Sequence, residues 1–330
     1  MPLLLTRKDV QAVLTMKEAI AAVEEGFRLL ALGKVLMPQR TAIRLQEPPG
    51  LHLAMPASLT GEGAAGGALG IKVVTVFPGN PAQHNLPTTL ATMLLHDPRT
   101  GAVVAILDAG FLTAMRTGAA SGVATRCLSR EDARTLGIFG AGVQARTQLL
   151  AIHEVRRLER VVVCDPVREA RERFAAEMSD RLSVSVTPTD DARLAAENDI
   201  VVTASSSKTP VFDGRWIKPG THLNGIGSHS PDARELDAEI VRRSRVISDH
   251  APARLAEDAD FMVPIQEGVI GADHVRVSLG DVLLGREPGR RSRDEITLFK
   301  SGGLAVQDVV TAARVFQLAR AAGIGHEVEI

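Results

Sequence analysis

The chain has no tyrosine and few other aromatic residues, with nine phenylalanines and one tryptophan among 330 residues. Without tyrosine, any mechanism whose proton donor is a phenol is excluded, including that of the Tyr-x-x-x-Lys dehydrogenases. Cysteine is also scarce, and we expect Cys127 and Cys164 to be small core residues of a reduced protein and not a disulfide framework. The nine histidines are scattered without ligand spacing, so we expect no metal.

Neither sign of charge predominates, because 38 Lys and Arg residues face 39 Asp and Glu residues. With no long basic run, an electrostatic nucleic-acid binder is not expected. No apolar stretch approaches the roughly 18 residues that a membrane span needs. Met1-Pro-Leu-Leu-Leu5 runs directly into charged residues, so no signal peptide is expected. We therefore predict a cytoplasmic protein with neither nucleic acid nor membrane as a partner.

The order of the sequence patterns indicates an α/β protein of two domains. Two amphipathic helical patterns, Thr6–Val13 and Met16–Leu32, precede several short strand patterns, which predicts a mixed α+β domain. From Arg134 onward, short apolar strands alternate with helices, which is typical of a Rossmann-type doubly wound parallel sheet. We place the first domain at 1–115, with 306–330 returning to it, and the second domain at 116–305.

A glycine-rich turn in the second domain predicts a dinucleotide site. The strand Thr135–Phe139 leads into Gly140-Ala-Gly-Val-Gln-Ala145, and a helical pattern follows. The two glycines permit a tight turn and close approach to a pyrophosphate, and the helix N-terminus attracts the phosphates. Asp165, at the end of the next strand, would accept from the ribose hydroxyls and repel a 2′-phosphate, which favours NAD(H). Arg168 could instead hold that phosphate, so NADP(H) remains possible.

Three cationic residues of the first domain suggest a pocket for an anion. Lys72 interrupts an apolar strand, Arg116 lies on an apolar helix, and Arg40 follows Pro38-Gln39. Such residues are rarely buried without a partner, and a carboxylate would be a suitable one. The alternatives are that Lys72 reaches solvent or a structural carboxylate, that Arg116 pairs with Asp108, and that Arg40 is a surface charge.

Three further polar positions are candidates on weaker grounds. His229 follows a strand of the second domain, where ligands of such sheets bind, although it could equally be an exposed residue of a capping loop. Ser205 begins a serine run after another strand and could meet the cofactor or belong to a plain polar loop. Asp308 could be a helix cap or a buried partner for a pocket cation.

Five ordered motifs make the whole chain resemble the ornithine cyclodeaminase/mu-crystallin family. They are Gly70-Ile-Lys72, Met115-Arg-Thr-Gly-Ala119, Gly140-Ala-Gly-Val-Gln-Ala145, Ser228-His-Ser-Pro-Asp-Ala-Arg-Glu-Leu-Asp237, and Phe299-Lys-Ser-Gly-Gly303 with Asp308. The resemblance implies a homodimer, in which the mixed domain binds substrate and forms the dimer interface while the Rossmann domain binds the nucleotide.

The resemblance also implies roles for individual residues. The expected catalytic residues are Lys72, Arg116, Arg40, His229 and Asp308. Those expected to hold the substrate, whose carboxylate the three cations would bind, are Arg40, Met55, Lys72 and Arg116. Those expected to touch the dinucleotide are Thr117, Gly140, Ala141, Gly142, Val143, Gln144, Asp165, Arg168, Ala204, Ser205, Gly227, Ser228, His229, Lys300 and Gly302.

One departure from the family pattern bears on the reaction. Cyclodeaminases of the family carry an aspartate, which assists the amine of ornithine, at the position of His229. An imidazole does not reproduce a carboxylate that recognises an ammonium group. The sequence therefore favours an NAD(P)H-dependent reductase of imino acids, of the ketimine or 1-pyrroline-2-carboxylate type. The alternatives are an ornithine cyclodeaminase, an alanine-dehydrogenase-like enzyme, and a non-catalytic ligand-binding protein; Lys72, His229 and water stay open as proton donor.

Overall fold

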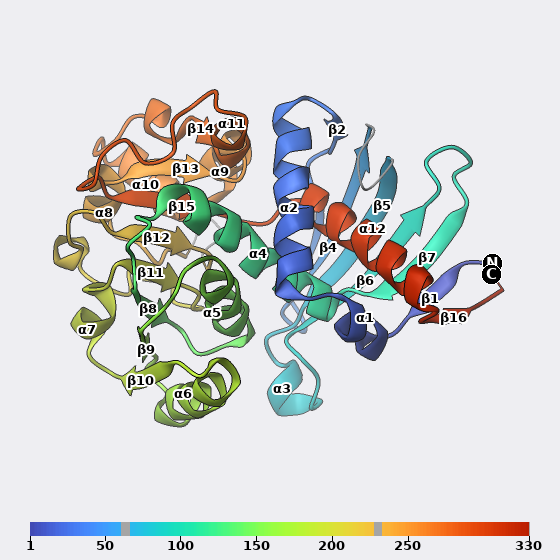
Figure 1. Cartoon of the computed structure of the whole chain (residues 1–330), viewed down its shortest axis with the longest axis horizontal. Coiled ribbons are helices and arrows are strands. Elements are labelled where there is room, and N and C mark those ends of the chain that lie inside the picture. The colour runs from blue at the N-terminus through green and yellow to red at the C-terminus, as the bar shows by residue number, and fades with distance from the viewer. Residues whose placement is uncertain (61–66, 228–232, 330) are drawn as a thin grey trace. The chain divides into compact units, whose positions relative to one another are not determined.

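The computed structural model describes residues 1–60, 67–227 and 233–329. The chain folds into two compact units, one comprising Met1–Arg116 and Leu304–Ile330 and the other Thr117–Gly303 (Figure 1). These boundaries lie within two residues of those expected from the sequence. Helix α4 (Gly110–Leu128) carries the chain from the first unit into the second. Within the described ranges, no helix is long and apolar enough to cross a membrane.

The first unit is built on a mixed sheet with the strand order β16-β1-β7-β6-β5-β4-β2, in which β3 also pairs with β4. All of its pairs are antiparallel except β1 with β7. The strands are β1 (Leu3–Leu5), β2 (Val35–Leu36), β3 (Thr41–Leu45), β4 (Gly50–Leu59), β5 (Ala68–Val76), β6 (Thr89–His96), β7 (Val103–Asp108) and β16 (His326–Glu327).

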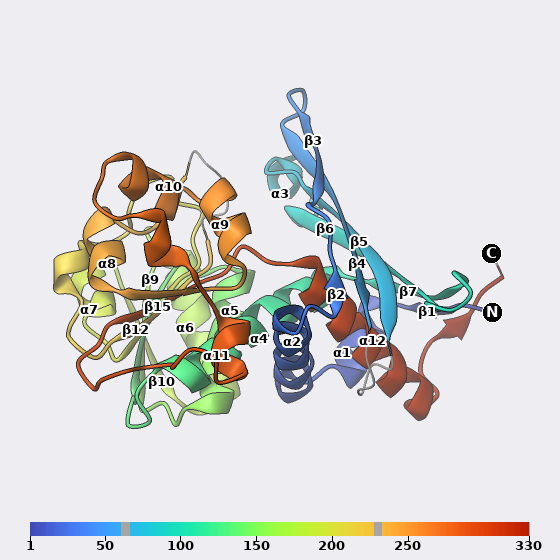
Figure 2. The same ribbon diagram turned by 90° about the horizontal axis from the view of Figure 1, so that it is seen from above.

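Helices of the first unit cover one face of this sheet. They are α1 (Arg7–Val13), α2 (Met16–Ala31) and α12 (Ala305–Ala322), while the short α3 (Asn80–Gln83) lies between β5 and β6 in the chain. Thr6 and Thr15 cap the first two helices through their side chains. Helix α2 lies against α12 (Figure 2). A Cβ atom on Gly26 would lie 3.1 Å from Val310, so this glycine permits the close approach of the two helices.

The central strand β5 shows how the two faces of the sheet differ. Its residues alternate between buried and half-buried, with Gly70, Lys72 and Val74 among the buried set. Because side chains alternate across a strand, the buried set lies on one face, the face that α12 covers. Ile71 and Val73 lie on the opposite face and remain half-exposed.

The second unit is built on a parallel sheet of eight strands in the order β10-β9-β8-β11-β12-β15-β13-β14, which confirms the Rossmann-type fold. The strands are β8 (Thr135–Phe139), β9 (Arg160–Cys164), β10 (Ser185–Thr189), β11 (Ile200–Thr203), β12 (His222–Gly225), β13 (Arg245–Ser248), β14 (Val277–Ser278) and β15 (Thr297–Lys300). The order reverses between β8 and β11, and ligands of such sheets bind beyond the carboxyl ends of the strands at that point.

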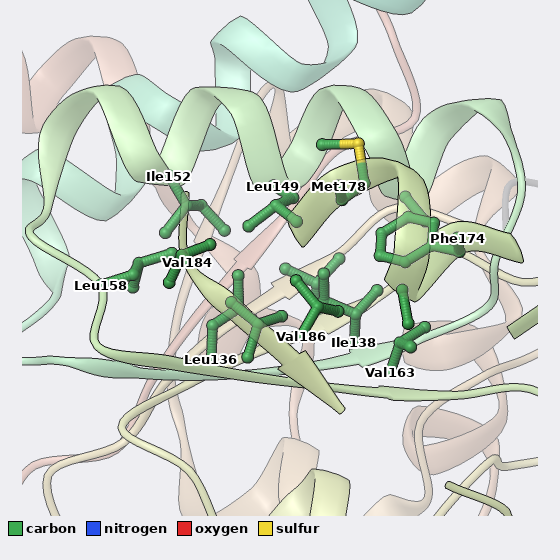
Figure 3. Packing of buried hydrophobic residues seen from close by; sticks show 14 of the residues in the cluster. Leu136, Ile138, Leu149, Ile152, Leu158, Val163, Phe174, Met178, Val184 and Val186 are labelled. Atoms are coloured by element: carbon green, nitrogen blue, oxygen red, sulfur yellow. The ribbon is translucent and has the colours of Figure 1, made fainter. Parts of the chain in front are cut away.

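Helices of the second unit follow most of its strands. They are α5 (Val143–Val155), α6 (Arg168–Leu182), α7 (Ala192–Ala196), α8 (Ala238–Arg243), α9 (Ala251–Glu257), α10 (Ala259–Gln266) and α11 (Leu279–Leu283), with short 3-10 turns at Gly214–Trp216 and Ala272–Val275. Leu149 of α5 and Phe174 of α6 pack with Ile138 of β8 in an apolar cluster (Figure 3). Trp216 packs against a second cluster in the same unit.

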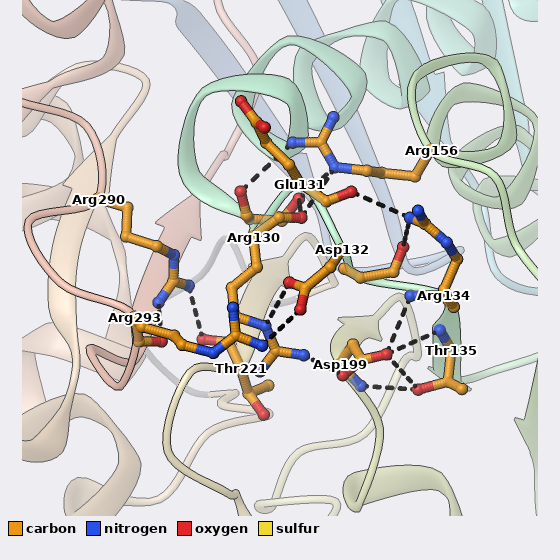
Figure 4. A network of polar contacts seen from close by, with 12 residues as sticks. Arg130, Glu131, Asp132, Arg134, Thr135, Arg156, Asp199, Thr221, Arg290 and Arg293 are labelled. Carbon is orange, nitrogen blue, oxygen red and sulfur yellow. Dashed lines mark hydrogen bonds and ion pairs between the residues drawn. The ribbon is translucent and has the colours of Figure 1, made fainter.

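A polar network fixes the amino end of β8 (Figure 4). The Asp199 carboxylate accepts hydrogen bonds from the backbone N–H groups of Arg134 and Thr135, at 2.9 and 3.0 Å, and from the Thr135 hydroxyl. Arg130 completes it with an ion pair to Asp199. The strand that leads into the glycine turn is thus held at its start by one carboxylate.

Candidate active site

Lys72 occupies the middle of the helix-covered face in the first unit. It pairs in register with Met55 of β4 and Met93 of β6, both buried. Its side chain is only 1% exposed, and its Nζ atom lies 2.7 Å from Oδ2 of Asp308 on α12. Lys72 therefore does not reach solvent, and it pairs with a carboxylate inside the unit.

Asp308 bridges Lys72 to a second cation. Arg116 donates from Nε to the other Asp308 oxygen at 2.9 Å, and from Nη1 to Oε1 of Gln307 at 2.9 Å. Of the two roles expected for Asp308, the structure shows the buried partner. Arg116 pairs with Asp308 and not with Asp108, whose carboxylate accepts from the Phe111 backbone at the start of α4.

This cluster carries more positive than negative charge. Among Lys72, Arg116, Arg40 and Asp308, three side chains are cationic and one is anionic. Burial lowers the pKa of Lys72 to about 8; Asp308 opposes this shift, and the charges of Arg116 and Arg40 add to it. Arg40 is half-buried, just before β3. A small anion that joined the cluster would relieve the repulsion among the cations.

The predicted glycine turn lies at the carboxyl end of β8, beside the point where the strand order reverses. Gly140 has a φ of +100°, and a Cβ there would lie 2.5 Å from the Ala204 carbonyl oxygen, so only glycine fits. A Cβ on Gly142 would meet nothing within 4 Å, which leaves the backbone at the N-terminus of α5 open to a ligand. Ala145 is fully buried against the sheet. These features fit a bound pyrophosphate.

Asp165 stands at the tip of β9, where the sequence predicts a ribose ligand. One of its oxygens accepts from the Ala141 N–H and the other from the Val167 N–H, each at 2.9 Å. A carboxylate oxygen has capacity for a further donor, so ribose hydroxyls can still be accepted. Arg168, the candidate for a 2′-phosphate, is exposed and donates to Glu172 at 2.7 Å.

Arg146 supports the glycine turn, a role that the sequence did not suggest. Its Nη1 atom donates to the carbonyl oxygens of Ala141 and Gly142, at 2.6 and 3.1 Å. The rest of its guanidinium binds Glu177 of α6. The conformation of the turn is therefore fixed from α5 and α6 as well as by Asp165.

The remaining positions expected near the dinucleotide fall into two groups. Thr117, Val143, Gln144, Ala204, Ser205 and Gly227 are described, whereas Ser228 and His229 lie outside the described residues. The N–H groups of Ser205 and Gly227 donate to the two oxygens of Glu235, at 2.6 and 2.7 Å. Glu235 and Gln307 each contact candidate site residues, and sequence reasoning predicted neither of them.

Lys300 and Gly302, both expected near the dinucleotide, make internal contacts with carboxylates of the second unit. Lys300 is fully buried, and its Nζ atom lies 2.5 Å from Asp260 and 3.6 Å from Asp258, so its amine is already engaged by carboxylates. The Gly302 N–H donates to Asp249. A Cβ on Gly302 would lie 1.6 Å from the Arg254 guanidinium, which explains the glycine by packing.

This buried ionic group could have been suspected from the sequence. Asp258 and Asp260 stand next to the apolar run Phe261-Met-Val263, which is the same signal that singled out Lys72. No pattern links Asp260 to a lysine 40 positions away. In the described ranges no group of three or more His, Cys, Asp and Glu side chains is placed to hold a metal ion.

Comparison with known proteins gives the family. The family model for ornithine cyclodeaminase/mu-crystallin proteins matches residues 1–323. The chain belongs to this family. It is 38% identical to the alanine dehydrogenase of Archaeoglobus fulgidus over 99% of this chain and 98% of that protein.

Two solved structures of the family resemble the chain along its length. The Thermococcus litoralis Delta(1)-pyrroline-2-carboxylate reductase, in complex with NADH and L-proline, superposes with a TM-score of 0.95 at 44% identity, covering 99% of this chain and 100% of that one. The iminosuccinate reductase of Paracoccus denitrificans, in complex with NAD+, superposes with a TM-score of 0.91 at 31% identity, covering 100% and 99% of the two chains.

A double-mutant cycle tests the bridge made by Asp308. We expect Asp308→Asn to lower the free energy of unfolding by about 3–5 kcal/mol, because it leaves two buried cations without a carboxylate. In a Lys72→Met background, the same change should cost at least about 1 kcal/mol less. Urea-induced unfolding followed by far-UV circular dichroism measures both.

The matched control is Glu18→Gln, which breaks the half-exposed pair with Arg314. It should cost less than about 1 kcal/mol. Strict additivity of Asp308→Asn and Lys72→Met would show that the two side chains do not stabilise one another.

Proposed function

We propose that the protein reduces the C=N bond of a small imine that carries an α-carboxylate, using NADH. The observation that carries the proposal is the buried cluster in which Lys72 and Arg116 share a single carboxylate, Asp308. Membership of a family that includes NADH-bound 1-pyrroline-2-carboxylate reductase supports it. The second unit would hold the dinucleotide at the Gly140–Ala145 turn.

The first unit would bind and orient the substrate. Arg116 donates from Nε to Asp308 and from Nη1 to Gln307. Its Nη2 atom takes part in neither hydrogen bond, and we assign this donor to the substrate carboxylate. Arg40 would bind the same carboxylate and so fix the face of the imine. The buried Met55 and Met93 beside Lys72 would contact the apolar part of the substrate.

Lys72 is the proton donor we favour over His229 and water. The Gly140–Ala145 turn would hold NADH, which would supply the hydride for the imine carbon. The nitrogen then needs a proton, and an ammonium with a pKa of about 8 is well matched to give one near neutral pH. Asp308 holds that ammonium in place through the 2.7 Å ion pair.

A second candidate reaction shares this site. The identity with the Archaeoglobus fulgidus alanine dehydrogenase favours reductive amination, in which a keto acid and ammonia give the imine that is then reduced. Ornithine cyclodeamination is disfavoured because histidine stands at position 229 in place of the aspartate. A non-catalytic ligand-binding protein would have less need for three cations.

We further propose that the protein is a cytoplasmic homodimer. The half-exposed Ile71 and Val73 of β5, together with the exposed Ile43 and Leu45 of β3, offer apolar surface that a second copy would cover. Both cysteines are free thiols, which fits a reducing compartment.

A substrate panel tests the reaction. Loss of NADH absorbance is expected with 1-pyrroline-2-carboxylate or 1-piperideine-2-carboxylate, because both are cyclic imines with an α-carboxylate. Pyruvate with ammonia or methylamine tests the amination alternative in the same assay. Proline formed from ornithine with catalytic NAD would point to cyclodeamination, and no turnover of any compound would favour the ligand-binding protein.

The pH dependence tests the role of Lys72. In the parent, kcat/KM should fall as the pH rises through about 8, because deprotonation removes both the charge that attracts the carboxylate and the proton to be donated. Lys72→Ala should lower kcat by about 100-fold or more and leave NADH affinity nearly unchanged. Lys72→Arg serves as the control that keeps the charge without titrating; a variant that retained the fall near pH 8 would assign it to another group.

Cofactor choice is tested at Asp165. Asp165→Ser should shift the ratio of kcat/KM for NADPH over NADH upward by about tenfold, because it removes the carboxylate that repels a 2′-phosphate. Asp190→Ser is the control, since Asp190 is an exposed acid just beyond the neighbouring strand β10. A parent enzyme that already prefers NADPH would contradict the assignment.

A further inference from the structure

Two loops of the second unit are joined by one buried side chain. Glu235 is fully buried, and its two carboxylate oxygens accept from the N–H of Ser205 at 2.6 Å and of Gly227 at 2.7 Å. Ser205 and Gly227 each lie two residues beyond a strand, β11 and β12 respectively. One carboxylate therefore sets the separation of two neighbouring loops at the carboxyl edge of the sheet.

The carboxylate fits closely against Gly227 and Ser205. A Cβ on Gly227 would lie 2.4 Å from the Glu235 carboxylate and 2.4 Å from the Ser205 carbonyl oxygen. The backbone of Glu235 is itself fixed, because its N–H and that of Leu236 donate to Asp260 at 2.9 and 3.0 Å. Asp260 in turn holds Lys300. A shift of this side chain would therefore break its hydrogen bonds to both loops.

The two N–H donors that face Glu235 favour its ionised form. Burial raises the pKa of its carboxyl group, while the Lys300 charge and the Ser205 donor oppose that effect. Because both oxygens face N–H donors, the ionised form satisfies both, whereas a neutral side-chain amide would turn a donor toward one of them.

Glu235, with the Ser205 and Gly227 N–H groups that it binds, is called the clamp below. Its place in the strand order indicates which part of the nucleotide it serves. The order reverses between β8 and β11, so the glycine turn and Asp165 lie on the β8–β9 side and the clamped loops on the β11–β12 side. In a doubly wound sheet each side holds one mononucleotide half. Asp165 marks the adenosine side, which leaves the nicotinamide half to the loops that Glu235 joins.

We propose that Glu235 is a positioning residue that shapes the binding site for the nicotinamide half of the dinucleotide. It acts through the Ser205 and Gly227 main chain and not by touching the reacting atoms. The inference rests on the proposed use of NADH and adds to it a residue with no assigned role.

Comparing two ligands separates this role from a general effect on folding. In Glu235→Gln, the dissociation constant for NADH should rise at least tenfold. That for adenosine diphosphate, which lacks the nicotinamide half, should change less than threefold. Isothermal titration calorimetry measures both. Equal weakening of the two ligands, or no weakening of either, would overturn the proposal.

Asp237→Asn is the matched control. Asp237 also accepts from two backbone N–H groups, those of Gly214 and Ile240, but it does so at the start of α8. The Asp237→Asn variant should bind both NADH and adenosine diphosphate with dissociation constants within threefold of those of the parent. A loss of NADH affinity equal to that of Glu235→Gln would contradict a specific clamp.

Gly227→Ala provides a second route if Glu235→Gln does not fold. It keeps the carboxylate but forces the loops apart, so NADH should again weaken and adenosine diphosphate should not. Unchanged NADH binding in Gly227→Ala would reject the clamp. A parent that binds adenosine diphosphate but not NADH would instead reject the proposed cofactor, and with it this inference.

Discussion

The contact between Asp308 and two cations is the interaction on which the first unit depends. An ammonium and a guanidinium in an apolar layer are tolerated only when a carboxylate offsets their charge and accepts their hydrogen bonds. Asp308 does both, with one oxygen for Lys72 and one for Arg116. Because it lies in the first turn of α12, the C-terminal helix must return to the sheet before the cluster can form.

The second unit uses carboxylates in a related way, but to hold main chain. Asp199 fixes the start of β8, Asp165 fixes the glycine turn, and Glu235 joins the loops after β11 and β12. Each accepts backbone N–H groups that no strand or helix satisfies, which stabilises one loop conformation over others. Asp199 therefore fixes main chain at the amino end of a strand, whereas Asp165 and Glu235 fix main chain at the carboxyl edge of the sheet.

The sequence predicted the features that depend on local pattern. The periodicity of apolar residues predicts helices and strands such as β8, and the spacing of the glycines predicts the turn at Gly140. Lys72 was identified because a charged residue interrupts an apolar strand. Strand β15 has a weaker pattern, because Thr297–Lys300 is short and ends in a lysine, although it lies between β12 and β13 in the sheet.

Sequence reasoning named Asp308 as a candidate partner for an unspecified pocket cation, and it named no partner for Lys300. Lys300 meets Asp260 across 40 positions, and Arg116 meets Asp308 across 192. Such pairs are brought together only by the tertiary fold, and a charge alone does not indicate whether its partner will be a ligand or another side chain. The family resemblance assigned Lys300 to the dinucleotide, and its charge alone did not indicate the ion pair with Asp260.

The scarcity of aromatic residues leaves the protein with a single strong intrinsic fluorophore. Trp216 lies in the second unit, in the short turn before β12, and packs against that unit's apolar core. Since tyrosine is absent, emission excited in the near ultraviolet comes from this one indole, which belongs to the second unit. Unfolding of the second unit can thus be followed by fluorescence without any introduced label.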